Sequence, residues 1–197
     1  ASWNQDWSAV RRNAESYLRN HPDNRYARLL LARSFWNNGD WNAATRIYQS
    51  FISSELPIQD LRAWASHYQR SGNLSRAEQL LQVVLEQHPQ HINTLIELMD
   101  IYHRTSRTRR LRPLADEVIR LAPNRVEGWI GLAQAHLSLA EPEPSIKCLQ
   151  TALELDPPNQ AAIRKMLADI FLLHLNQPLL AQKELEHTLQ LTPHDVE

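Results

Sequence analysis

Proline recurs along the chain at a nearly constant interval, each time at the end of a half-apolar segment. Steps of 35, 32, 34, 34 and 36 residues separate Pro22, Pro57, Pro89, Pro123, Pro157 and Pro193. The segments that they close are alike, as in residues 17–22 (YLRNHP), 84–89 (VLEQHP) and 152–157 (ALELDP). A sequence period near 34 residues indicates a repeat architecture, and it constrains the fold more strongly than any local motif.

Each period contains two stretches of helical spacing. In residues 61–68 the apolar positions fall at i, i+3, i+4 and i+7, which is one stripe of an amphipathic helix. Residues 71–73 (SGN) interrupt this stripe, and a second one runs from Ala77 to the proline at position 89. Because proline lacks the N–H and clashes with the preceding turn, it cannot continue a helix. Each period is therefore predicted to be a helix pair whose second helix ends shortly before the proline.

The composition excludes several classes of protein. A formal net charge of -1 excludes a globally basic nucleic-acid binder and an acidic tail, although 18 arginines against 3 lysines leave room for a local patch. Cys148 is the only cysteine, so no intrachain disulfide can form. The longest apolar run, residues 166–175, is about half the length of a membrane span. We therefore expect no membrane span. The sequence does not identify the organism, and it does not distinguish the bacterial cytoplasm from the periplasm.

The pattern resembles the tetratricopeptide repeat family, whose unit is an antiparallel helix pair of about 34 residues. Trp129, Leu132, Ala133 and His136, followed by Ser145, Leu149, Ala152 and Pro157, occupy most of the positions of that family's motif. A second copy contains Leu31, Ala32, Phe35, Gly39, Ala44, Tyr48 and Phe51. The copy with Leu111, Ala115 and Val118 exchanges small and large residues, and the last copy has about one extra residue between positions 174 and 178.

The resemblance implies an all-α fold, a right-handed superhelical solenoid of antiparallel helix pairs. We expect one solenoid over residues 1–197, with a half repeat at 6–22 and repeats at about 25–57, 58–91, 92–125, 126–159 and 161–194. The half repeat and the lack of a polar closing helix suggest that the chain is excised from a longer protein. Its end faces could then mediate self-association or contacts with other domains.

The resemblance also implies a binding groove lined by the first helix of each repeat. The groove positions transferred to this sequence are Tyr26, Leu29, Arg33, Trp36, Asn37, Gln59, Arg62, Ser66, Gln69, Arg70, Asn93, Glu97, Asp100, His103, Arg104, Glu127 and Gln134. Trp36 is either an interface hot spot or packed against the neighbouring half repeat. The lining is positive near Arg33, Arg62 and Arg70 and acidic near Glu97 and Asp100, which suits a peptide of mixed charge.

One subtype of the family grips the C-terminal carboxylate of chaperones with lysine, arginine and asparagine at set groove positions. This sequence has Leu29, Arg33, Ala63, Asn93 and Glu97 there, so the clamp pattern is absent. The expected function is a non-catalytic scaffold that binds a peptide or protein partner. The resemblance places such a scaffold in a bacterial secretion, envelope-assembly or polymer-export system. The alternative is a regulatory arm of a larger enzyme.

Catalytic motifs are absent: the sequence has no phosphate-binding loop, no HExxH and no GxSxG. We expect no enzyme activity, no cofactor and no metal. His88 and His91, with Glu97, Asp100 and His103 on one helical face, are the only candidates for metal ligands, and solvated turn residues are the simpler interpretation. Cys148 lies beside Leu149 in a predicted second helix, where a small buried hydrophobic residue is a simpler interpretation than a nucleophile.

A cluster of arginines marks one turn between helices. Arg104, Arg107, Arg109, Arg110 and Arg112 could bind a polyanion, either a nucleic acid or an anionic polysaccharide. The sequence interleaves no aromatic residue with them, although sites for single-stranded nucleic acid usually combine charge with stacking rings. A solvated turn, partly compensated by Asp116 and Glu117, is the simpler interpretation. We therefore favour a protein partner over nucleic acid.

Overall fold

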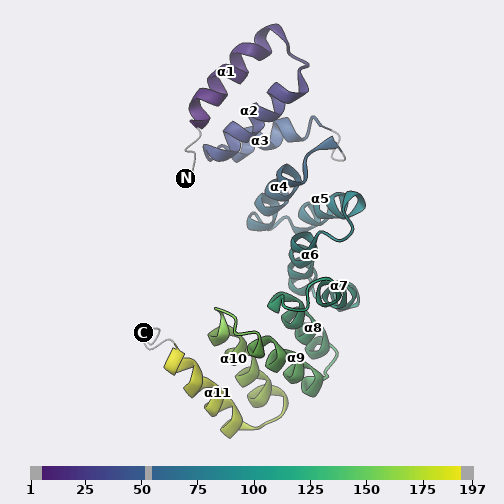
Figure 1. The fold of residues 1–197 in the computed structure, drawn as a ribbon, viewed down its shortest axis with the longest axis vertical. Helices are drawn as coiled ribbons and strands as arrows, with labels where there is room; N and C mark the ends of the chain where they lie inside the picture. Colours follow the sequence, from purple (N-terminus) through teal and green to yellow (C-terminus); the bar gives the residue numbers. More distant parts are fainter. Residues whose placement is uncertain (1–5, 52–54, 192–197) are drawn as a thin grey trace. The chain divides into compact units, whose positions relative to one another are not determined.

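A computed structural model describes residues 6–51 and 55–191, and every regular element in this part of the chain is helical (Figure 1). The helices are α1 (Trp7–Asn20), α2 (Arg25–Asn37), α3 (Trp41–Tyr48), α4 (Ile58–Arg70), α5 (Leu74–Gln87), α6 (Ile92–Arg104), α7 (Thr108–Leu121), α8 (Val126–Ser138), α9 (Pro142–Glu154), α10 (Gln160–Asp169) and α11 (Pro178–Leu191). A π-helical segment, η2 (Ile170–His174), continues α10. The all-α prediction is confirmed.

The chain divides into two compact units, Ala1–Pro89 with α1 to α5 and Gln90–Glu197 with α6 to α11. Within each unit the stronger packing contacts join helices that are adjacent or next but one in sequence, as expected for stacked helix pairs. The fold is therefore a tandem series of antiparallel helix pairs. The prediction of a single solenoid domain over 1–197 stays a prediction.

The turn between the two helices of each pair has the same backbone conformation throughout the described residues. The second residue after the first helix, or after η2 in the last pair, has a positive φ in all five pairs: Gly39 (82°), Gly72 (79°), Ser106 (54°), Ala140 (58°) and Asn176 (50°). In the first four pairs the next residue donates its N–H five residues back, as in Asp40 N to Phe35 O (2.9 Å) and Asn73 N to Tyr68 O (2.8 Å). This is the hydrogen bond of a Schellman-type helix end.

Side chains at the start of several helices cap them. Asp6, Asn24, Asp40 and Asn73 each accept a hydrogen bond from the backbone N–H three residues later, at 2.9 to 3.2 Å. Each cap satisfies one of the N–H groups that the first turn of a helix leaves without a partner. The dipeptide Asp-Trp occurs at residues 6–7 and 40–41, and in both places the aspartate is the cap and the tryptophan is the first residue of a helix.

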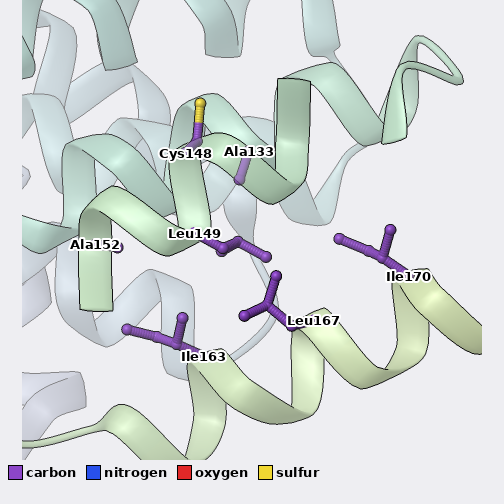
Figure 2. Close-up of a cluster of buried hydrophobic side chains, with 7 residues drawn as sticks. All are labelled: Ala133, Cys148, Leu149, Ala152, Ile163, Leu167 and Ile170. Atoms are coloured by element: carbon purple, nitrogen blue, oxygen red, sulfur yellow. The ribbon is translucent and has the colours of Figure 1, made fainter. Parts of the chain in front are cut away.

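Apolar residues from successive helices form the core of each unit. In the second unit one cluster joins Ala133 of α8, Cys148, Leu149 and Ala152 of α9, and Ile163, Leu167 and Ile170 of α10 and η2 (Figure 2). The copy with exchanged small and large residues also packs well, since Leu111, Ala115 and Val118 are all buried. The small residue that lets α8 approach α6 closely is Gly131 of α8, where a Cβ would lie only 2.0 Å from Met99 Cε.

Two helices depart from the expected pattern. Helix α3 ends at Tyr48 after eight residues, so Phe51 lies beyond it and not within a second helix of ordinary length. The extra residue expected in the 174–178 turn lies before that turn, within the π-helical segment η2. There Leu175 N bonds Ile170 O at 3.2 Å and Gln177 N bonds Phe171 O at 2.7 Å, six residues back.

Candidate functional site

A hollow of about 240 Å³ lies where the first helices α2 and α4 meet, inside the first unit. We call it the α2–α4 hollow, and its lining residues are Trp7, Arg33, Trp36, Asn37, Tyr48, Gln59, Asp60 and Ala63. Arg33, Trp36, Asn37 and Gln59 belong to the groove positions expected from the sequence. The structure therefore brings four of the expected residues together in one concavity, and helices α1 and α3 supply the other walls.

The floor of the α2–α4 hollow is an ion pair. The Arg33 guanidinium donates two parallel hydrogen bonds to Asp60, from Nε to Oδ1 at 2.9 Å and from Nη2 to Oδ2 at 2.6 Å. Asp60 is only 4% exposed, and the Tyr48 hydroxyl donates a third bond to its Oδ1 at 3.0 Å. The hydrogen bond with Asp60 raises the pKa of Arg33. Burial, and then the Asp60 charge, raises the pKa of Tyr48.

This pairing changes the expected charge of the lining. Arg33 was expected to give the groove a positive patch, but its charge is balanced by a buried carboxylate within the same unit. Arg70, expected in the same patch, lies with its guanidinium carbon 5.2 Å from the centre of the Trp41 ring on α3. The α2–α4 hollow therefore offers aromatic and amide surface more than net charge.

Aromatic rings hold the walls of the α2–α4 hollow in place. The Trp36 ring lies edge-on to Tyr48 at 6.2 Å and to His67 at 5.7 Å, measured between centroids. Tyr48 in turn stacks on Trp64 at 5.7 Å. Such contacts add to the stability of buried rings beyond the area they remove from water. Trp36 thus packs within its unit and also presents part of its surface to the hollow.

The amides at the rim are the groups that a partner could reach most readily. Asn37 and Gln59 are both exposed, and Asn37 Nδ2 donates to the Arg33 carbonyl at 2.8 Å, which holds its Oδ1 in a fixed place. A side-chain amide offers a donor and an acceptor together, as a peptide backbone does. The arrangement can therefore accept an apolar side chain between aromatic walls and bond the backbone beside it.

Other expected groove residues of the first unit lie elsewhere. Tyr26 is 67% exposed and lines a separate concavity of about 450 Å³ between α1 and α2, together with Val10, Ala14, Tyr17 and Leu30. Leu29 and Arg62 are half-buried, Ser66 is exposed, and Gln69 has a buried Nε2 with no partner among the described residues.

In the second unit the expected residues pair with one another or with their neighbours. Arg125 bonds Glu127 at 2.9 Å and approaches Asn93 Oδ1 at 3.5 Å, which links the starts of α6 and α8. Arg104 pairs with Asp100 at 3.4 Å. Glu97 and Gln134 are half-buried and His103 is exposed. The assignment of all these residues to a partner-binding groove stays a prediction.

The arginine turn has an aromatic partner that the sequence did not reveal. The guanidinium carbons of Arg107 and Arg110 lie 4.7 and 5.8 Å from the centre of the Tyr102 ring. Tyr102 belongs to α6 and is only 5% exposed, so it supports the arginines and offers no platform to a base. Glu117 accepts a hydrogen bond from Arg120 Nε at 2.7 Å. Arg109 and Arg112 are exposed, and polyanion binding here stays a prediction.

Among the candidate metal ligands and the cysteine, His91 and Cys148 have local structural roles. His91 caps α6, since its Nδ1 lies 3.3 Å from the Thr94 N–H and 2.8 Å from its hydroxyl. Within the described residues no three metal-ligating side chains converge. Cys148 is buried in the cluster of Figure 2, and burial raises the pKa of its thiol. In the same part of the chain, no helix combines the length and apolar character that a bilayer crossing requires.

Comparison with known proteins places the fold. Residues 4–54 match the tetratricopeptide repeat family, and no curated protein sequence matches the chain. A solved tetratricopeptide repeat protein from Parabacteroides merdae is 17% identical with a TM-score of 0.75, over 94% of this chain and 73% of that one. MamA from Desulfovibrio magneticus, solved from residue 41 to its end, is 16% identical with a TM-score of 0.73, over 94% of this chain and 98% of that one.

A third solved structure has a similar fold, with a lower TM-score. The Cut9–Hcn1 hetero-tetramer of the APC/C is 20% identical with a TM-score of 0.64, over 97% of this chain but only 38% of that one. Proteins with this fold generally mediate protein–protein interactions and are typically non-catalytic. The recurring hairpin turn and the stacked helix pairs agree with these likenesses: the chain has the fold of solved tetratricopeptide repeat proteins, and its residues 4–54 match that family.

Proposed function

We propose that the chain is a non-catalytic interaction module that binds a peptide or protein partner at the α2–α4 hollow. The observation that carries this proposal is the hollow itself: Trp7 and Trp36 form its walls, a neutral ion pair forms its floor, and exposed amides of Asn37 and Gln59 stand at its rim. Aromatic surface in a concavity with a few polar groups is typical of binding sites.

The partner chemistry follows from this lining. Because Arg33 and Asp60 already neutralise each other, a charged side chain entering the hollow would meet no unbalanced opposite charge. An apolar or aromatic side chain would bury its surface against the tryptophans. Asn37 and Gln59 would then bond the backbone of the bound segment. A setting in bacterial secretion, envelope assembly or polymer export stays an expectation from the resemblance.

The test is selection of binding peptides from a random display library on the full chain, followed by affinity measurements with point variants. We expect Asn37→Ala combined with Gln59→Ala to weaken the selected peptides by about 2 kcal/mol, since each lost amide bond is worth roughly 1 kcal/mol. These two residues are exposed, whereas Trp36→Ala would also disturb the contacts with Tyr48 and His67.

The matched control is Asn42→Ala with Gln82→Ala, which removes two exposed amides from the second helices α3 and α5. The control should leave peptide affinity unchanged, and both double variants should keep the far-UV CD spectrum. Equal affinity of the Asn37/Gln59 variant and the original chain would place the binding surface elsewhere.

A further inference from the structure

The concavity of about 450 Å³ between α1 and α2 shares no lining residue with the α2–α4 hollow, and we call it the α1–α2 face. Its apolar lining consists of Val10, Ala14 and Tyr17 of α1 and Tyr26, Ala27 and Leu30 of α2. Two asparagines complete the lining, and none of the lining residues is charged. Tyr17 is 48% exposed, although its ring stacks on His21 at 4.5 Å between centroids. An exposed apolar concavity of this kind indicates an interaction surface.

The second unit contains the same two-helix arrangement in α7 and α8. These helices have the lengths of α1 and α2, 14 and 13 residues, and the connecting segments 21–24 and 122–125 are equally long. Val10, Ala14 and Tyr17 of α1 correspond, in this order, to Leu111, Ala115 and Val118 of α7. In α7 all three positions are 1% exposed or less. The second unit therefore shows how a covered face of this type is packed.

The face in the second unit is covered by helix α6, which packs against both α7 and α8. Helix α6 has buried apolar side chains at i, i+3, i+4 and i+7, namely Leu95, Leu98, Met99 and Tyr102. Met99 Cε lies 2.0 Å from where a Cβ of Gly131 would be, so the contact between α6 and α8 is direct. Among the described helices, none packs closely against both α1 and α2, so the α1–α2 face lacks the element that covers its counterpart.

We propose that the α1–α2 face binds an amphipathic helix of a protein partner, in the place that α6 occupies in the second unit. Apolar side chains at helical spacing are the usual anchors of a helix in such a groove. Because none of the lining residues is charged, these anchors would be neutral. A second copy of the chain is a poorer occupant, since its first helices α4, α6, α8 and α10 already bury apolar side chains within their own units.

One position distinguishes this partner helix from α6. Gly131 of α8 corresponds to Leu30 of α2, and Leu30 lines the α1–α2 face. Because a Cβ at position 131 would already overlap Met99, the larger side chain of Leu30 leaves no room for a methionine at the equivalent position of a partner helix. The partner helix should therefore have large apolar residues at i, i+3 and i+7 and a small residue at i+4.

The experiment titrates the full chain into a fluorescently labelled peptide with the sequence of residues 91–105, in which Met99→Ala supplies the small residue. A lactam bridge between Asp100 and a lysine introduced by Arg104→Lys keeps the peptide helical, because isolated helices of this length are marginal in water. Both bridged residues are exposed in α6, so the bridge lies away from the apolar side chains. We expect saturable binding in fluorescence anisotropy. The bridged peptide that keeps Met99 should bind at least tenfold more weakly.

Two variants of the chain locate the bound peptide. Tyr17→Glu places a charge on the α1–α2 face and should weaken binding at least tenfold, since burying a charge without a partner is unfavourable. Leu185→Glu is the matched control: it places the same charge on an exposed leucine of α11, and it should leave the affinity unchanged. Both replaced side chains are exposed, so both variants should keep the far-UV CD spectrum and the midpoint of urea unfolding.

Absence of saturable binding by both peptides, or an equal loss in Tyr17→Glu and Leu185→Glu, would overturn the proposal. Equal affinity for the two peptides would remove the requirement for a small residue. Light scattering of the chain alone is expected to show a monomer, and a dimer that Tyr17→Glu dissociates would assign the face to a second copy instead. Asn37→Ala with Gln59→Ala should not change binding of the helical peptide, so this inference and the proposal for the α2–α4 hollow fail separately.

Discussion

The two units place their glycines in different parts of the same repeat. In the first unit, Gly39 and Gly72 occupy the positive-φ position of the hairpin turns. In the second unit the corresponding turns have Ser106, Ala140 and Asn176, and the glycines lie inside helix α8 at positions 128 and 131. The chain has only these four glycines, so the contrast covers them all.

The contrast extends to the side chains that lie between the first helices of each unit. On α8 the missing side chain of Gly131 leaves the space that Met99 of α6 occupies, and Met99 is only 4% exposed. In the first unit no glycine lies between α2 and α4. The Arg33–Asp60 ion pair and the rings of Trp36 and Tyr48 lie there instead. Bulky groups that meet edge-on leave the α2–α4 hollow, whereas the methionine fills its space. The same repeat thus leaves a concavity between α2 and α4, whereas the Met99 side chain fills the space beside Gly131 between α6 and α8.

The largest effect is expected from Asp60→Ala in the first unit. Arg33 and Tyr48 would both lose their shared acceptor in a largely buried place, which should lower the free energy of unfolding by about 3 kcal/mol. Urea unfolding followed by far-UV CD measures this. Asp100→Ala, which removes an exposed ion pair in the second unit, should cost less than about 1 kcal/mol. Equal costs would show that the Arg33–Asp60 pair does not support the α2–α4 contact.

The next effect is expected from Gly131→Leu in the second unit. The new side chain would occupy the place of the Met99 methyl group, and overpacking of this kind costs about 2 kcal/mol. Met99→Ala in the same chain should recover part of the loss, so the double variant should be more stable than the sum of the single costs predicts. Strict additivity in urea unfolding would contradict a direct contact between these residues.

The smallest effects are expected in the turns. Gly72→Ala should lower stability by about 1 kcal/mol, because its φ of 79° is unfavourable for alanine. A Cβ there would meet nothing within 4 Å, so only backbone strain contributes. Ala140→Gly should raise stability by about 0.5 kcal/mol, since relief of strain exceeds the added entropy of the unfolded chain. Thermal unfolding compares the pair, and changes of the same sign would show that the two turns are not equivalent.

The fold could be predicted from the sequence because its signals are local and repeated. The spacing of apolar residues in 61–68 and the stop at Pro89 lie within one period, and later periods repeat them. The shared turn was harder to predict. A glycine indicates a positive φ at positions 39 and 72, whereas Ser106 and Ala140 adopt the same conformation without that indication. The early end of α3 was also missed, since Phe51 fits the apolar stripe although the helix stops three residues before it.

The candidate site could be predicted only in part. Arg33, Trp36, Asn37 and Gln59 were identified by their positions in the first helices. Asp60 was not, because it lies 27 residues from Arg33 and nothing local marks the pair. Asp60 lies in the first turn of α4, where a negative charge interacts favourably with the helix dipole. This position was the one signal in the sequence that marked the residue. Trp7 was missed because nothing local in the sequence indicates where its ring points.

The π-helical segment at Ile170–His174 has a consequence for how this chain can change in evolution. It holds one residue more than the corresponding turn of an α-helix, and the hairpin bond from Gln177 reaches back six residues instead of five. Deleting a single residue there would restore the spacing of the other pairs without moving α11 to a new register. We therefore expect a variant that lacks one residue of segment 170–174 to keep the hairpin.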